Sequence, residues 1–156
     1  MAVAIIPLLL TGEQTIGSHD PRFLPTLHAS AGFVLLLLVI LRLGWWWKHP
    51  PPAALSPSRL ERLGAKLGHF GLYAGMVLIP LTGWLAYIEH VRRSLGMRPA
   101  SLFGWRIPLL PDFGINWHLI HNWGGKLMLV LIVLHVAAAI KHHYYDKDKT
   151  LMRMLP

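Results

Sequence analysis

Long apolar segments alternate with short polar connections along the chain. Three apolar segments, at 24–47, 67–88 and 119–140, are each long enough to cross a bilayer as a helix, which takes about 18–20 residues. A fourth apolar segment, at 1–12, is too short to span and is interpreted as the second part of a spanning helix. The pattern predicts a single all-α membrane domain covering residues 1–156.

Composition agrees with a membrane protein and excludes several kinds of site. Of the 156 residues, 54% are hydrophobic and only 14% are charged, which is unusual for a soluble domain of this size. The chain has no cysteine, so disulfides, zinc–thiolate sites, iron–sulfur clusters and cysteine-attached haem are excluded. The net charge of +8 is assigned to membrane orientation, and no nucleic-acid partner is expected.

Basic residues predict the orientation of the spans. The connection at 42–66 carries five of them and the segment after residue 140 carries four, whereas the opposite side of the membrane carries five in all. Because positively charged loops stay in the cytoplasm, the C-terminus is predicted to be cytoplasmic. The connection at 90–117 holds three prolines and three glycines and is predicted to be an external loop with some ordered structure.

Histidines inside the apolar segments indicate the chemistry. His121 and His135 are fourteen residues apart, which is nearly four helical turns or about 21 Å, so they share one face near opposite membrane surfaces. The span at 24–47 runs in the same direction and carries His28 and, fourteen residues later, Arg42. By depth, His28 therefore matches His121, and Arg42 matches His135.

An imidazole inside a bilayer is costly and usually functional. Two imidazoles that face each other from separate helices predict iron bound by two histidines, and haem b is the cofactor that fits such a gap. The alternatives are a hydrogen bond between helices or a proton relay. Small residues next to these histidines would leave room for a flat macrocycle or simply let helices pack: Gly32, Gly124, Gly125, Ala138 and Ala139.

The remaining candidate residues lie at the predicted inner side of the membrane. His69 lies at the depth of His135, and its neighbour Tyr73 would crowd a haem, so a hydrogen bond to haem or quinone is favoured, with haem ligation as the fallback. Arg42 would pair with a haem propionate, or snorkel to the interface. Two histidines that end the last span would meet a headgroup or quinone, or be solvated: His142 and His143. The other histidines are expected to be solvated or interfacial: His19, His49, His90 and His118.

Several segments together resemble the bacterial cytochrome b561 family. The C-terminal "LHVAAAIKHHYYDKDKTLMRMLP" is similar to the end of that family's last helix. The earlier segments "LHASAGFVLLLLVILR", "LGHFGLYAGMVLIPLTGW" and "IHNWGGKLMLVLIVLH" resemble its second, third and fourth helices. The resemblance implies a four-helix bundle in the inner membrane with two b haems and a quinone partner. By position, His28 and His121 would bind the outer haem, and His135 the inner haem.

The resemblance also implies a function with open alternatives. Single electrons would cross the membrane between a small-molecule or protein donor at the outer surface and a quinone in the lipid bilayer. Some family members oxidise superoxide and reduce ubiquinone, and the outer arginines could attract such an anion: Arg92, Arg93 and Arg106. The alternatives are an anchor subunit that carries electrons for a separate dehydrogenase or hydrogenase, and a transporter without haem.

The short first helix leads to a prediction about the DNA upstream of Met1. In the family, the second ligand of the inner haem lies early in the first helix, and no histidine here precedes His19. Counting back about 14 residues from the polar residues at 11–13 places that histidine a few residues before Met1. We expect the in-frame upstream codons to encode further helix with a histidine after a basic start. A stop codon directly upstream of Met1 would contradict this.

Overall fold

The computed structural model describes residues 2–12, 23–49, 58–95, 100–102, 105–107, 111 and 113–147. The four helices are α1 (Ala2–Gly12), α2 (Phe23–Lys48), α3 (Arg59–Leu95) and α4 (Trp117–Tyr144), with strands β1 (Ala100–Leu102) and β2 (Trp105–Ile107) before α4. Three of the helices are long and apolar enough to cross a membrane, namely α2, α3 and α4. His19 and the C-terminal segment 148–156 lie outside the described residues. The all-α membrane bundle is confirmed.

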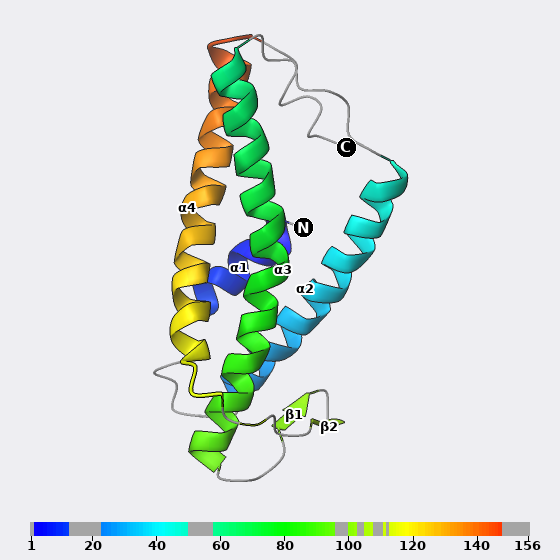
Figure 1. Cartoon of the computed structure of the whole chain (residues 1–156), viewed down its shortest axis with the longest axis vertical. Helices are drawn as coiled ribbons and strands as arrows, with labels where there is room; N and C mark the ends of the chain where they lie inside the picture. Colours follow the sequence, from blue (N-terminus) through cyan, green and yellow to red (C-terminus); the bar gives the residue numbers. More distant parts are fainter. Residues whose placement is uncertain are drawn as a thin grey trace.

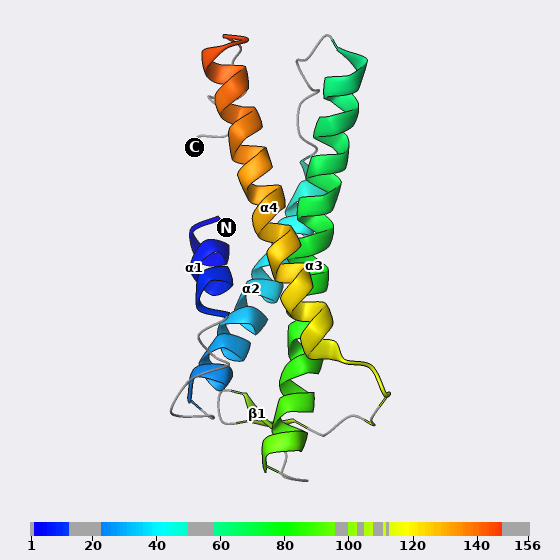
Figure 2. The same ribbon diagram turned by 90° about the vertical axis from the view of Figure 1, so that its left-hand side faces the viewer.

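Helices α3 and α4 form the most extensive pair and run in opposite directions (Figure 1). They cross near their middles and separate towards the start of α3 and the end of α4 (Figure 2). Helix α2 packs on α3 and runs in the direction of α4, and its last turns diverge from both (Figure 1). The short α1 contacts α2 and α4. We call the end of the bundle with β1 and β2 the hairpin end. The opposite end, where Lys141 meets Glu61, is the ion-pair end.

The helices extend beyond the apolar segments that predicted them. Helix α3 runs from Arg59 to Leu95, whereas hydropathy gave only 67–88. Its last turns include Arg92 and Arg93, so this part of the expected external loop is helical. The backbone hydrogen bonds of a helix can continue beyond its apolar part into water, where charged side chains cost little free energy. Beyond the helix, β1 pairs antiparallel with β2, which confirms some ordered structure in the connection.

Polar contacts fix the start of α4 against the end of α3. The side chain of Asn116 caps α4 by accepting a hydrogen bond from the backbone N–H of Leu119 at 2.9 Å. Glu89 of α3 accepts another from the N–H of Trp117 at 3.1 Å. These two acceptors satisfy N–H groups that the first turn of a helix leaves without partners. The start of α4, and with it the height of His121, is thereby set against α3.

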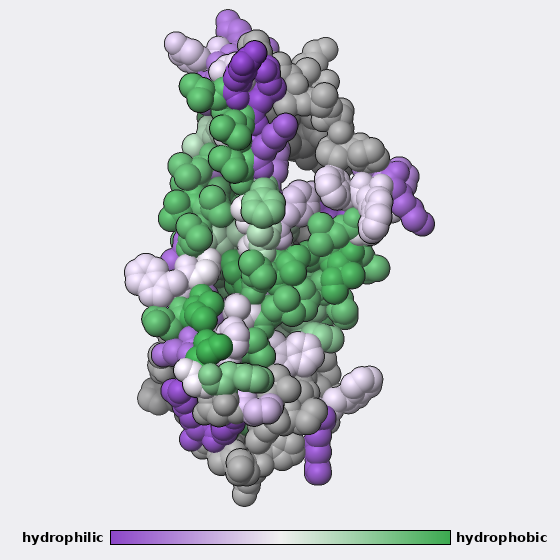
Figure 3. Space-filling view, viewed as in Figure 1, coloured by the Kyte–Doolittle hydropathy of each residue, from purple (hydrophilic) through white to green (hydrophobic). Residues whose placement is uncertain are grey.

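Apolar side chains cover the outside of the bundle. Figure 3 shows them over the middle of the molecule and along α4, with hydrophilic side chains towards the helix ends. Many large apolar residues are exposed, among them Leu38, Ile40, Val130 and Val133. An exposed apolar surface of this extent is expected where lipid rather than water is the solvent. Membrane lipid therefore contacts most of the middle of the bundle.

Close contact between α3 and α4 depends on glycines of α3. A Cβ added at Gly75 would lie 2.8 Å from Met128 Sδ, and one at Gly71 would lie 3.2 Å from Leu131 Cδ1. Both distances are too short for a larger side chain unless the neighbour moves. Small residues that allow two backbones to approach are typical of helix pairs in membranes.

We predict that Gly75→Val destabilises the bundle, because two extra methyl groups must displace Met128. Overpacking of this kind costs about 1–3 kcal/mol. The control is Gly64→Val on the same helix, where an added Cβ meets nothing within 4 Å. Thermal unfolding in detergent should show a lower midpoint for the first variant than for the second. Equal midpoints would contradict the packing account.

Candidate functional site

A cavity of about 460 Å³ lies between all four helices in the half of the bundle near the hairpin end. Its volume falls within the range of roughly 300–1,000 Å³ that is typical of ligand and cofactor sites. Most of its wall is apolar, and α1 contributes Ile5, Leu8 and Leu9. The polar side chains in the wall are His28, Tyr87, His90, His118, His121, Asn122 and Lys126. The described cavity is therefore a mostly apolar pocket with several imidazoles in its wall.

His28 of α2 and His121 of α4 face each other in this wall. Their ring centroids are 6.0 Å apart, and the ring planes are inclined at 78°. His121 Nδ1 lies 3.0 Å from the backbone oxygen of Ile79 on α3. A carbonyl oxygen can only accept, so Nδ1 carries the proton and Nε2 has a free lone pair. His28 Nδ1 is buried and has no hydrogen-bond partner among the described residues.

The pair fits a haem. A metal–imidazole nitrogen bond is about 2 Å long, so two imidazoles on opposite sides of one iron place their ring centroids roughly 6 Å apart. The observed 6.0 Å matches this span without rearrangement. The unpartnered nitrogen of His28 also favours a bound group at this place, because buried polar atoms in native proteins usually have a partner. Glycines at 12, 32, 83 and 125 also line the cavity, and their small size widens it.

His69 and His135 form a second pair, nearer the ion-pair end. Their ring centroids are 5.4 Å apart with an interplanar angle of 65°. His135 is half-buried and His69 is exposed, and neither lines the cavity that the described residues form. His69 belongs to α3 and His135 to α4, and these helices approach closely at Gly71 and Leu131. This pair differs from His28 and His121 because it does not line the described cavity.

Arg42 lies on the part of α2 that diverges from the other helices (Figure 1). Its side chain is exposed, and no carboxylate among the described residues pairs with it. One turn further along α2, Trp46 contacts the ring of Tyr73 on α3 at 6.2 Å. Equal depth along two helices therefore does not bring Arg42 against His135, because the helices separate.

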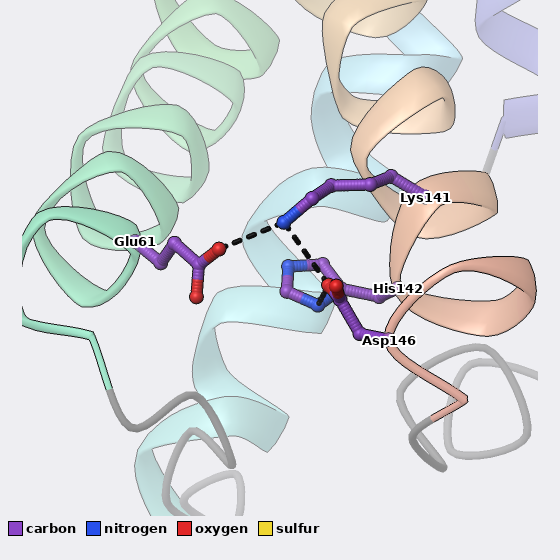
Figure 4. A network of polar contacts seen from close by, with 4 residues as sticks. All are labelled: Glu61, Lys141, His142 and Asp146. Carbon is purple, nitrogen blue, oxygen red and sulfur yellow. Dashed lines mark hydrogen bonds and ion pairs between the residues drawn. The ribbon is translucent and has the colours of Figure 1, made fainter.

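His142 belongs to a polar cluster at the ion-pair end (Figure 4). Lys141 Nζ lies 2.7 Å from Glu61 Oε1 and 3.1 Å from Asp146 Oδ2, and His142 Nδ1 lies 2.9 Å from the same aspartate oxygen. The cluster joins the start of α3 to the end of α4. The ring of His143 instead contacts that of Tyr144 at 4.8 Å.

Comparison with known proteins agrees with this geometry. The model of the family described as prokaryotic cytochrome b561 matches residues 1–156. The chain belongs to this cytochrome b561 family. It is similar to "Cytochrome b561 homolog 2" of Escherichia coli (strain K12), with 37% identity over 84% of this chain and 70% of the relative. It is also similar to "Cytochrome b561 homolog 1" of the same organism, with 27% identity over 100% of this chain and 88% of the relative. No solved structure matches.

Membership of the cytochrome b561 family makes the protein a membrane electron-transfer protein that uses b-type haem, which confirms the family prediction. His90 and His118 both line the cavity beside His121. His118 is also exposed, whereas His90 is partly buried near the end of α3. His49 is exposed as expected and stacks on Trp45 at 4.3 Å.

Sequence reasoning missed two residues of α3 that contact His121 and a third that bonds to the same carbonyl oxygen. Ile79 supplies the carbonyl oxygen, Thr82 donates to the same oxygen at 2.9 Å, and Gly83 lies directly against the imidazole. The segment "IPLTG" did carry a signal. A proline followed three residues later by a glycine is unusual inside a helix, and it marks a place where the backbone meets something closely.

Proposed function

We propose that this cytochrome binds haem b between His28 and His121 and carries single electrons through the membrane between an outer donor and a quinone. The observation that supports this most strongly is the imidazole pair, 6.0 Å apart across a cavity of about 460 Å³. Both imidazoles line this cavity, which offers space for a flat cofactor beside them.

The residues of the chain have distinct roles in this proposal. Bound haem supplies an iron that gains and loses one electron at a time. His121 would present Nε2 as a ligand, because its Nδ1–H is donated to Ile79 O. His28 would supply the opposite nitrogen from α2. The apolar wall, including Leu8 and Leu36, excludes water from the site. A dry site of fixed geometry needs little rearrangement when charge enters or leaves it.

We further propose that the hairpin end faces the outside of the bacterial inner membrane and that the C-terminus is cytoplasmic. The nine basic residues of the 42–66 connection and of the segment after residue 140 support this orientation. Aromatic residues at that end, Trp45 to Trp47, are exposed and suit a membrane interface. A donor would then meet the hairpin end, where His90 and His118 line the cavity.

The donor in this proposal is a small molecule or protein at the outer surface, with superoxide as one candidate. Its support is the positive charge there. Arg106 of β2 is exposed, whereas Arg93 forms an ion pair with Glu89 at 2.5 Å. Ubiquinone or another quinone would exchange at the ion-pair end, where His142 and His143 offer imidazole nitrogens. His142 is held by Asp146 in a polar cluster that could exchange protons with water.

The proposed haem ligands lead to a direct prediction. The purified protein should be red, with the spectrum of a low-spin b haem. His121→Ala and His28→Ala should each abolish this haem, because each removes one of two ligands. The control is His49→Ala, which removes an exposed histidine that stacks on Trp45. Haem would be measured per chain by the pyridine haemochrome assay. A full haem complement in His121→Ala would refute the assignment.

The second histidine pair leads to a separate prediction. We propose that His135 binds an inner haem and that His69, whose ring centroid lies 5.4 Å from that of His135, assists as a hydrogen-bonding neighbour. His135→Ala should then lose the inner haem, whereas His69→Ala should keep it with an altered midpoint potential. Loss of one haem per chain in both variants would instead make His69 the second ligand.

A further inference from the structure

One turn of α3, from Ile79 to Gly83, surrounds the imidazole of His121 with backbone atoms. The Ile79 oxygen accepts the Nδ1–H at 3.0 Å. A Cβ added at Gly83 would lie 2.7 Å from Cε1, 3.0 Å from Nδ1 and 3.3 Å from Nε2 of the same ring. Only a residue without a side chain allows the ring this close to the helix. The ring therefore lies in a slot formed by α3.

The acceptor in this slot is an unusual carbonyl. The Ile79 carbonyl belongs to the peptide bond that precedes Pro80, so it is a tertiary amide, whose oxygen is more electron-rich than that of an ordinary peptide. In a regular helix the same oxygen also accepts the N–H of Gly83, four residues later. The strong acceptor is the Ile79 oxygen, and it lies against Nδ1 of His121, the nitrogen that the proposed function does not use as a ligand.

Thr82 competes for the same oxygen. Its hydroxyl lies 2.9 Å from Ile79 O and 3.0 Å from Leu78 O, so its one proton is shared between two carbonyls. A hydroxyl that donates to Ile79 O withdraws electron density from it and weakens its bond to His121. Serine and threonine hydroxyls commonly bond to carbonyls in the preceding turn of membrane helices. Here the hydroxyl of Thr82 bonds to the same carbonyl oxygen that accepts the hydrogen bond from His121, a proposed haem ligand.

The geometry points to Ile79–Gly83 as the element that positions His121 and sets the potential of the haem that it holds. This inference rests on the proposed function, in which His121 is a ligand. A stronger hydrogen bond from Nδ1–H makes the imidazole a more basic ligand, which stabilises ferric over ferrous iron and lowers the midpoint potential. Gly83 leaves room for the imidazole of His121, and Ile79 O accepts its Nδ1–H hydrogen bond. The hydroxyl of Thr82 weakens this hydrogen bond.

The test is a set of conservative variants of the full-length protein in detergent. Thr82→Val keeps the shape of the side chain and removes the hydroxyl, so His121 should bind Ile79 O more strongly and the midpoint potential should fall. Thr82→Ser keeps the hydroxyl and should retain the wild-type potential. Redox titration followed at the haem absorption bands measures both. An unchanged or raised potential in Thr82→Val would overturn the tuning role.

Gly83→Ala tests the positioning role. Its methyl group would overlap the ring of His121, so the haem should be lost or become high-spin because one ligand has moved. The control is Gly68→Ala on the same helix, where an added Cβ meets nothing within 4 Å. A wild-type low-spin spectrum and haem content in Gly83→Ala would overturn this role.

His121→Ala separates failure of this inference from failure of the proposed function. If His121→Ala retains all haem, then His121 is not a ligand and the proposed function itself fails. If His121→Ala loses haem while Thr82→Val and Gly83→Ala both behave as wild type, the proposed function stands and only the role of Ile79–Gly83 is overturned.

Discussion

An imidazole inside the apolar part of a membrane protein needs partners for both of its nitrogens, and much of this structure supplies them to one ring. His121 donates Nδ1–H to a backbone oxygen of α3, which leaves Nε2 available as a ligand, and both His121 and His28 line the cavity. Such a ring is costly in lipid without these partners. The glycine at 83, the proline at 80 and the caps at the start of α4 all serve its position.

The cavity depends on contributions from every helix, including the short one. Leucines of α1 close the side that α2 and α4 leave open, and Gly125 of α4 lies 3.6 Å, measured from an added Cβ, from Leu9 of α1. Helices α3 and α4 share the most extensive contact, although they separate towards the ion-pair end (Figure 2). Their close contacts at Gly71 and Gly75 fix α4, and with it His121, against α3.

Hydropathy and helical spacing predicted the spans and the facing histidines, because both depend on residue type and on a regular rise per residue. The same reasoning could not give the helix ends, since α3 continues through the charged residues Arg92 and Arg93. It also could not place Arg42 relative to His135, because spacing within a helix says nothing about the angle between helices, and α2 diverges from α4 (Figure 1). The Ile79 oxygen escaped notice because every residue has such a group, although Pro80 and Gly83 marked the turn.

The most direct measurement of the central claim is the electron paramagnetic resonance spectrum of the ferric protein. Two imidazole ligands make iron low-spin. Rings at the 78° of His28 and His121 leave two of the iron d orbitals nearly equal in energy. The account therefore predicts a strongly anisotropic low-spin signal of the kind given by nearly perpendicular imidazoles, absent from His121→Ala. A ferric spectrum with only high-spin iron, or a strongly anisotropic low-spin signal of undiminished intensity in His121→Ala, would contradict it.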